Sequence, residues 1–133
     1  MTEPVSHYSR LGGEPALRRL VRRFYELMDT LPEAHGIRKL HERDLSRAAE
    51  RLFMFLSGWL GGPRLFEEQI GLPRLRARHL PFPVGYAEAA QWMLCMRQAM
   101  AEVIADENLR TALDKALTEL ADHIRNLNFP PPA

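Results

Sequence analysis

Apolar residues recur at steps of three and four along most of the chain, and this periodicity restricts the possible folds more than any other feature of the sequence. The pattern is clearest in four stretches, residues 15–31, 45–60, 86–104 and 109–127. Such spacing gathers apolar side chains on one face of an α-helix. Because no stretch has a convincing strand pattern, the sequence predicts an all-α fold with four main helices.

The composition is that of one ordinary globular domain. Of the 133 residues, 46% are hydrophobic and 26% are charged, so we expect residues 1–129 to form a single domain and residues 130–133 to form a short, mobile, proline-rich tail. The 18 basic and 17 acidic residues give a net charge of +1, which predicts neither nucleic acid nor an anionic membrane as a partner. A chain of this length is expected to be a monomer or a homodimer.

Cysteine usage and hydropathy are typical of a cytoplasmic protein. The lone cysteine, Cys95, cannot form an internal disulfide, as is usual in a reducing compartment. No apolar run approaches the ~18 residues of a membrane span, and the N-terminus lacks the pattern of a secretion signal. We therefore expect a soluble chain in the cytoplasm with no membrane partner.

The stretch RARHLPFP at residues 76–83 places a histidine at the end of a helix. Proline lacks an N–H and disfavours the α conformation in the residue before it, so Pro81 must end a helix near His79 or Leu80. A neutral imidazole there can donate from one nitrogen to the carbonyl of Leu75 and direct the other nitrogen at a metal, as an axial haem ligand does. Alternatively, His79 only interacts with the helix dipole and the last carbonyl groups.

No other pattern in the sequence offers a competing centre. There is no phosphate-binding glycine loop, nucleophile elbow or paired-histidine zinc helix. Cys95 has no cysteine or histidine at ligand spacing, and His7, His35 and His123 are expected at the surface. Residues 64–83 are rich in proline and poorly periodic, which inside a compact domain is typical of a functional segment or of one that wraps around something.

Four motifs follow one another along the chain: FYELM at 24–28, ERLFMFLSGWLGGPR at 50–64, RARHLPFP at 76–83, and a tryptophan at position 92. With these motifs the chain resembles the group II truncated haemoglobins, short globins whose helices form a two-over-two sandwich around a haem. The resemblance covers nearly the whole chain, from about residue 8 to residue 129. It implies a truncated globin-like, all-α fold with haem b (iron protoporphyrin IX) as cofactor.

The same resemblance implies roles for residues on the two sides of the haem. His79 would be the axial iron ligand, and Tyr25 and Trp92 would lie over the opposite, distal face. His41 falls where the family often has tyrosine or phenylalanine, so it either adds a third polar group, acting through Tyr25, or is exposed. Ala48 falls where many globins have the distal histidine, and its methyl group leaves a wide entrance. Alternatively, Tyr25 and Trp92 satisfy one another or fill the core.

A haem also requires an apolar slot and a match for its two carboxylates at the open edge. The candidates for the slot are Phe24, Leu52, Phe55, Leu75, Phe82 and Met96. Leu52, one turn after Ala48, should line the distal side. Arg51 and Arg78 match positions where family members pair with the haem propionates. Considered one at a time, each apolar candidate is more simply explained as a core residue than as part of a haem slot. Each arginine is likewise more simply explained as a solvated surface residue.

The donors on the distal side decide which function the resemblance implies. Dioxygen takes on negative charge when it binds haem iron, and a hydrogen bond to a charged group contributes about 1.5–3 kcal/mol. If Tyr25 and Trp92 both donate, oxygen affinity rises by roughly two or more orders of magnitude. We therefore expect reversible binding of dioxygen and other diatomic ligands, with release slow enough to favour ligand capture, sensing or oxidation chemistry over bulk oxygen transport.

Two alternatives remain open at this point. The first is a haem oxidoreductase, either a nitric oxide dioxygenase that forms nitrate or a peroxidase-like enzyme, served by an unidentified reductase. The small Ala48 and the polar Tyr25, His41 and Trp92 permit such chemistry, although they assign no catalytic residue. The second is a helical interaction module without a cofactor, which the histidine-proline stretch and the pocket tryptophan argue against.

Overall fold

The computed structural model describes residues 6–126. The expected tail at 130–133 therefore lies outside the described residues. Within the described range, all the regular structure is helical, as the all-α prediction requires. The elements are α1 His7–Leu11, α2 Gly13–Thr30, the 3₁₀ helix η1 Pro32–Ala34, α3 His35–Arg38, α4 Ser46–Trp59, α5 Leu65–Gln69, α6 Leu75–His79, α7 Tyr86–Val103 and α8 Glu107–Ile124.

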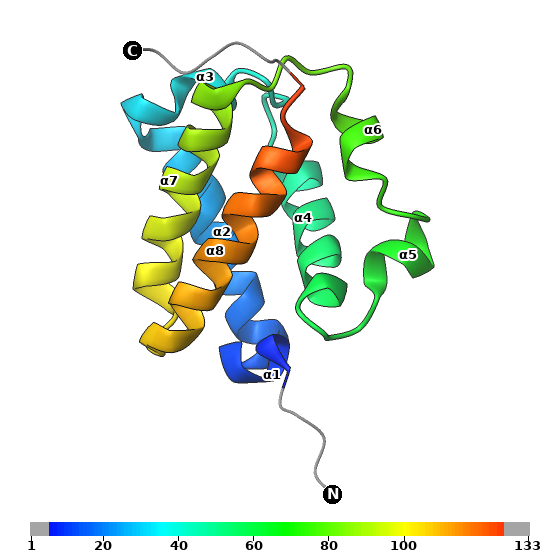
Figure 1. The fold of residues 1–133 in the computed structure, drawn as a ribbon, viewed down its shortest axis with the longest axis vertical. Coiled ribbons are helices and arrows are strands. Elements are labelled where there is room, and N and C mark those ends of the chain that lie inside the picture. The colour runs from blue at the N-terminus through cyan, green and yellow to red at the C-terminus, as the bar shows by residue number, and fades with distance from the viewer. Residues whose placement is uncertain (1–5, 127–133) are drawn as a thin grey trace, which may run out of the picture.

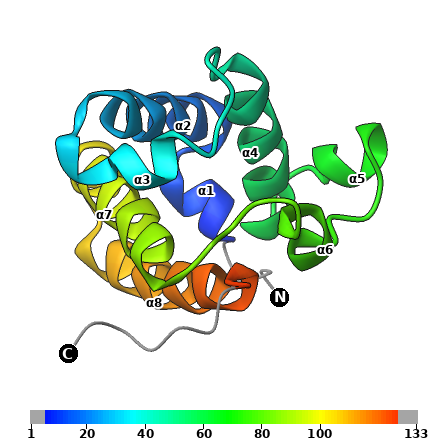
Figure 2. The same ribbon diagram turned by 90° about the horizontal axis from the view of Figure 1, so that it is seen from above.

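The four long helices, α2, α4, α7 and α8, correspond to the four helices predicted from the periodicity (Figure 1). Helix α2 packs against α4 and α7, and α7 packs against α8, which builds a sandwich of two helix pairs (Figure 2). Fully buried apolar side chains fill the space between them, among them Leu17, Leu20, Met100, Leu109 and Leu113. The two-over-two arrangement expected from the resemblance is present.

The turn after α4 explains the glycine pair at 61 and 62. Gly61 has a φ of 97°, a left-handed conformation that glycine adopts readily. A Cβ on Gly62 would lie 2.5 Å from the ring of Tyr8, so only glycine fits there. The N–H of Tyr8 donates to the carbonyl of Leu60 at 2.9 Å. The two glycines thus allow α1 to close over the end of α4.

Polar side chains fix where two of the long helices begin. Asp106 caps α8, because its carboxylate accepts the N–H of Leu109 at 3.1 Å. The same carboxylate pairs with Arg10 at 2.9 Å and so joins α1 to α8. At the start of α4, the carboxylate of Asp44 accepts the N–H of Ser46, the first residue of the helix, at 2.9 Å.

The poorly periodic segment at 64–83 contains two short helices, α5 and α6, which lie beside the four long helices (Figures 1 and 2). Helix α5 contacts α4, and α6 contacts α8. None of the residues of α6 is buried. No helix within residues 6–126 is long and apolar enough to cross a membrane.

Candidate functional site

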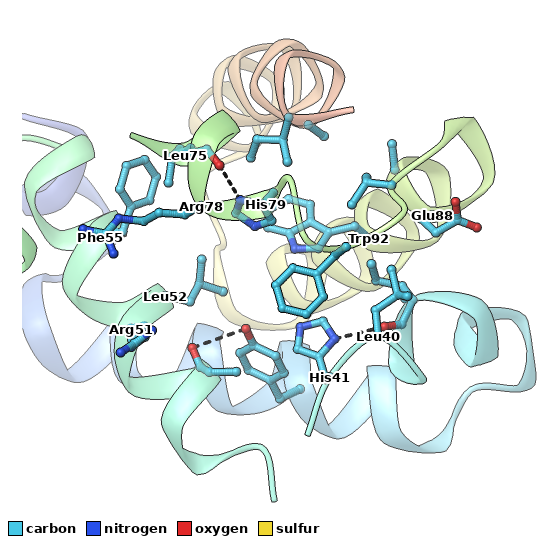
Figure 3. A pocket seen from close by; sticks show the side chains of 18 of the residues that line it. Leu40, His41, Arg51, Leu52, Phe55, Leu75, Arg78, His79, Glu88 and Trp92 are labelled. Carbon is cyan, nitrogen blue, oxygen red and sulfur yellow. Dashed lines mark hydrogen bonds between the residues drawn. The ribbon is translucent and has the colours of Figure 1, made fainter. Parts of the chain in front are cut away.

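A cavity of about 520 Å³ lies between α4, α6, α7 and α8 (Figure 3). Its volume falls in the range of roughly 300–1,000 Å³ that is usual for small-molecule and cofactor sites. Most of the residues predicted from the sequence line this cavity, namely Tyr25, His41, Ala48, Arg51, Leu52, Phe55, Leu75, Arg78, His79, Phe82 and Trp92. The fold therefore gathers side chains from well-separated parts of the chain around one space.

His79 is the last residue of α6, and its half-buried ring lines the cavity. The ring Nδ1 lies 2.6 Å from the carbonyl oxygen of Leu75, the partner expected from the sequence (Figure 3). Because a carbonyl can only accept, a neutral ring donates from Nδ1 and keeps an unshared electron pair on Nε2. This hydrogen bond fixes both the tautomer and the direction of the ring, and it leaves Nε2 available to a metal.

Tyr25, on α2, supplies a hydroxyl group to the cavity wall. Its side chain is only 8% exposed, and the hydroxyl donates to the carbonyl oxygen of Ala48 over 3.4 Å, a long hydrogen bond. Burial raises the pKa of Tyr25 well above its usual range, because the charged phenolate would lose its hydration. The hydroxyl therefore remains protonated and able to donate at any ordinary pH.

Trp92, on α7, lies between His79 and His41 in the close view of the cavity (Figure 3). Its ring centroid is 5.0 Å from that of Phe24, which supports the indole from behind. The indole N–H makes no hydrogen bond to any part of residues 6–126, so Tyr25 and Trp92 do not satisfy one another. An indole nitrogen can only donate, which makes it a donor for a guest in the cavity.

His41 is half-buried at the cavity wall rather than exposed. Its Nδ1 donates to the carbonyl oxygen of Ile37 at 2.9 Å, and its ring centroid is 5.9 Å from that of Tyr25. Burial lowers the pKa of His41, and the positive charge of Arg38 acts in the same direction, whereas the hydrogen bond to Ile37 raises it. A neutral His41 presents Nε2 as an acceptor beside the Tyr25 hydroxyl.

Two positions on α4 contribute apolar surface beside these polar groups. Ala48 and Leu52 are half-buried and line the cavity, one turn apart. Ala48 offers only a methyl group and its backbone carbonyl to this side. Neither side chain can bind a metal or donate a hydrogen bond, so the polar contacts come from Tyr25, His41 and Trp92.

The two arginines predicted from the sequence, Arg51 and Arg78, line the cavity and are exposed. Arg51 is exposed on α4 and has no ion pair or side-chain hydrogen bond within residues 6–126. Arg78 is already engaged: its Nε donates to the carbonyl of Pro73 at 2.7 Å and its Nη2 to that of Leu72 at 3.1 Å. Arg51 is therefore freer than Arg78 to meet an anionic group.

Two candidates for the slot, Phe24 and Met96, do not line the cavity. Both side chains are fully buried in the core. The ring of Phe24 contacts Tyr25 at a centroid distance of 4.8 Å and Trp92 at 5.0 Å, and so packs behind these two residues. Met96, one turn after Trp92, points into the helix interface. Sequence periodicity identified their buried face but not how deep they lie.

Other lining residues were not singled out from the sequence. The apolar ones are Ile37, Leu40, Leu56, Phe66, Val84, Ala89, Leu120, Ala121 and Ile124, and the charged ones are Glu42, Asp44, Arg47 and Glu88. The apolar stripe of α8 predicted a buried face, but periodicity alone does not distinguish a face against the core from a face against a cavity.

The composition of the walls indicates what the cavity can hold. No group of three histidine, cysteine, aspartate or glutamate side chains suited to a metal ion occurs in the described part of the chain. The imidazole of His79, on the wall of a mainly apolar cavity, fits a metal that brings its other ligands within a flat organic ring. Arginine at the rim fits acidic groups on such a ring.

Comparisons with known proteins show the family to which the chain belongs. The model of the bacterial-like globin family matches residues 6–126. The chain is 39% identical, over 114 residues, to the group 2 truncated haemoglobin YjbI of Bacillus subtilis (strain 168). The aligned region covers 86% of this chain and 84% of that protein. The chain belongs to the group II truncated haemoglobins.

Solved structures of truncated haemoglobins have the same fold. The group II two-on-two haemoglobin of Agrobacterium tumefaciens is 45% identical, with a TM-score of 0.91 over 94% of this chain and 97% of that one. The truncated oxygen-avid haemoglobin of Bacillus subtilis is 37% identical, with a TM-score of 0.84 over 92% of this chain and 100% of that one. Membership of this globin family carries haem binding and oxygen binding in general.

Proposed function

We propose that this truncated haemoglobin binds haem b in the 520 Å³ cavity, with Nε2 of His79 as the axial iron ligand. The observation that carries the proposal is the 2.6 Å hydrogen bond from Nδ1 of His79 to the carbonyl of Leu75. This bond holds the imidazole in the tautomer that a metal needs.

When bound, haem supplies an iron atom with one open coordination position at which dioxygen and other diatomic molecules bind and acquire negative charge. The chain supplies the surroundings. Leu52, Phe55 and Leu75 offer apolar surface on which the flat ring can lie, and they exclude water from it. Arg51 at the rim provides a positive charge for a carboxylate of the ring, and Arg78 provides a second.

Tight oxygen binding is the second part of the proposal. The indole N–H of Trp92 makes no hydrogen bond within residues 6–126 and is available to a ligand. To donate to a ligand, the Tyr25 hydroxyl would lose only its long hydrogen bond to the Ala48 carbonyl. Two such donors stabilise a negatively charged guest more strongly inside the cavity than water would outside. The relative from Bacillus subtilis whose structure is described as oxygen-avid offers a precedent.

His41 would act as an acceptor rather than as a third donor. Its Nδ1–H is committed to the carbonyl of Ile37, so Nε2 can accept from Tyr25 or from a ligand that carries a proton. Because the Tyr25 hydroxyl has a single hydrogen, it could donate either to His41 or to a ligand, so His41 would compete with the ligand for that donor. Its influence on a ligand would then pass through Tyr25.

The absorption spectrum of the purified protein with one equivalent of haemin tests the proposal. We expect a sharp haem band in the ferric state, a shift to a five-coordinate ferrous spectrum on reduction, and a slowly decaying oxygen complex after aeration. Haemin in buffer without the protein is the matched control. A spectrum identical to that of free haemin would contradict haem binding, and oxygen loss within milliseconds would contradict the role of the two donors.

A further inference from the structure

Helix α6 carries the iron ligand of the proposed function but is poorly anchored by its own side chains. None of its five residues is buried. The hydrogen bonds of Arg78 go to Leu72 and Pro73, which belong to the same segment. Its guanidinium carbon lies 5.3 Å from the ring centroid of Phe66, a core residue of α5. Helix α6 also contacts the long helix α8. The contact between α6 and α8 is therefore where residues that hold His79 in place are to be sought.

Asn126, two residues beyond the end of α8, makes four hydrogen bonds to the chain that follows His79. Its Nδ2 donates to the carbonyl of His79 at 3.1 Å and to that of Phe82 at 2.7 Å. Its Oδ1 accepts the N–H of Val84 at 2.9 Å, and its own N–H donates to the carbonyl of Val84 at 2.8 Å. The side-chain amide thus uses both of its donors and its acceptor on one short segment.

These contacts link the cavity wall to the ligand-bearing segment. Ile124, the last residue of α8, lines the cavity, and Asn126 follows it after one residue. The carbonyl of His79 accepts from both Asn126 and the N–H of Phe82, which lies 2.9 Å away. The backbone of His79 is therefore held from one side while its ring is held by Leu75 from the other.

We infer that Asn126 is a positioning residue for His79, and that its amide sets the height and tilt of the imidazole against the haem. The inference rests on the proposed function, because it requires His79 to be the iron ligand. Asparagine is well suited to the task because the segment offers two carbonyls and one N–H. A carboxylate could accept from Val84 but could donate to neither carbonyl.

The test compares Asn126→Asp with the wild-type holoprotein, and Asn108→Asp serves as the matched control. The control makes the same chemical change at an exposed residue in the first turn of α8. Two quantities are measured: the rate at which haem passes to excess apomyoglobin, and the iron–histidine stretching frequency of the ferrous protein by resonance Raman spectroscopy. The frequency reports the bond to His79 directly, which a general loss of stability would not shift.

For Asn126→Asp we expect haem release to accelerate by about 10- to 100-fold, the range typical of lost partners behind a metal ligand. We also expect the iron–histidine band to shift or broaden, while Asn108→Asp leaves both quantities unchanged. An unshifted band together with wild-type haem release would overturn the inference. The His79 assignment would survive that result, because the wild-type band itself establishes a histidine ligand.

Asn126→Ala provides a second variant in case Asn126→Asp does not fold, since it removes the amide without adding charge. Helical content is checked first by circular dichroism. In the wild-type protein, amide hydrogen exchange at Val84 gives a further measurement that needs no variant. We expect protection well above that of a free loop, and exchange at the unprotected rate would also overturn the inference.

Discussion

His41 and His79 are held in the same way on the wall of one cavity. Each ring donates from Nδ1 to the carbonyl four residues earlier, at 2.9 Å to Ile37 and at 2.6 Å to Leu75. In both cases Nε2 keeps its electron pair. Their different roles therefore come from position: His79 ends α6 on one side of the cavity, and His41 lies beside Tyr25 on the other (Figure 3).

The two distal donors can be tested one at a time. Tyr25→Phe and Trp92→Phe each remove one donor and keep most of the ring volume. Because a hydrogen bond to a charged group contributes about 1.5–3 kcal/mol, we expect each change to speed oxygen dissociation by about tenfold or more. Stopped-flow mixing of the oxygen complex with dithionite measures the rate.

Tyr8→Phe is the matched control for the tyrosine variant, because it removes the same hydroxyl from a ring that packs near Gly62, outside the cavity. If the two distal donors act independently, the double variant should release oxygen faster than the wild type by a factor equal to the product of the two single-variant factors. Oxygen dissociation at the wild-type rate in both single variants would refute the proposed distal hydrogen bonding.

At this scale the sequence predicted the His79–Leu75 hydrogen bond, because a proline two residues later dictates where the helix ends. It did not predict that the Tyr25 hydroxyl bonds to the Ala48 carbonyl, since that contact joins residues 23 positions apart. Nor did it predict that Phe24 lies behind the cavity wall. Depth below a surface depends on how helices cross, which periodicity does not specify.

Among the elements, the long helices were readily predicted, whereas of α5 and α6 only the end of α6 at His79 was predicted. Helices α2, α4, α7 and α8 have enough turns for the periodicity to be clear, and glycine, proline or a capping side chain marks their ends. Helices α5 and α6 have five residues each. A five-residue helix is too short to establish a period, so within residues 64–83 the sequence predicted only a helix end near His79, from Pro81, and described the segment as poorly periodic.

The start of α8 gives a prediction about pH. The pKa of Asp106 is held below its usual value by the N–H of Leu109 and then by Arg10. A carboxyl group whose pKa falls on folding stabilises the fold when it is ionised, and this stabilisation disappears as the pH falls through the folded-state pKa. We therefore expect Asp106→Ala to lower the melting temperature at pH 7 and to differ less and less from the wild type below about pH 4.

Thermal unfolding followed by circular dichroism from pH 7 to pH 3 measures this difference. Glu119→Ala is the control, because Glu119 is exposed on the same helix and makes no ion pair or side-chain hydrogen bond within residues 6–126. A deficit for Asp106→Ala that stayed constant across this pH range would mean that the carboxylate does not act through its charge.

The described part of the molecule combines a well-packed core with the cavity that His79 lines. Buried side chains such as Leu17, Met100 and Leu113 fill the core between α2, α7 and α8. The cavity beside it, of about 520 Å³, is bounded by the weakly anchored α6. A cofactor in this space would supply the contacts that α6 lacks, so folding and haem binding should be coupled.

The coupling is measurable as a difference between the apoprotein and the holoprotein. A ligand that binds only the folded chain stabilises it by about 4 kcal/mol when its concentration is 1,000 times the dissociation constant. We therefore expect the urea midpoint to rise when haemin is added, and the rise to grow with haemin concentration. Equal midpoints with and without haemin would show that haemin does not bind the folded chain in preference to the unfolded one.

The measurement that tests the central claim most directly is chemical rescue of the axial ligand. His79→Gly removes the imidazole and leaves a space that free imidazole can fill, while His123→Gly makes the same change at an exposed histidine of α8. We expect the ferrous His79→Gly protein to lack the five-coordinate histidine spectrum and its iron–histidine Raman band until imidazole is added, whereas His123→Gly retains both. A normal ferrous spectrum in His79→Gly without imidazole would contradict the assignment of His79 as the iron ligand.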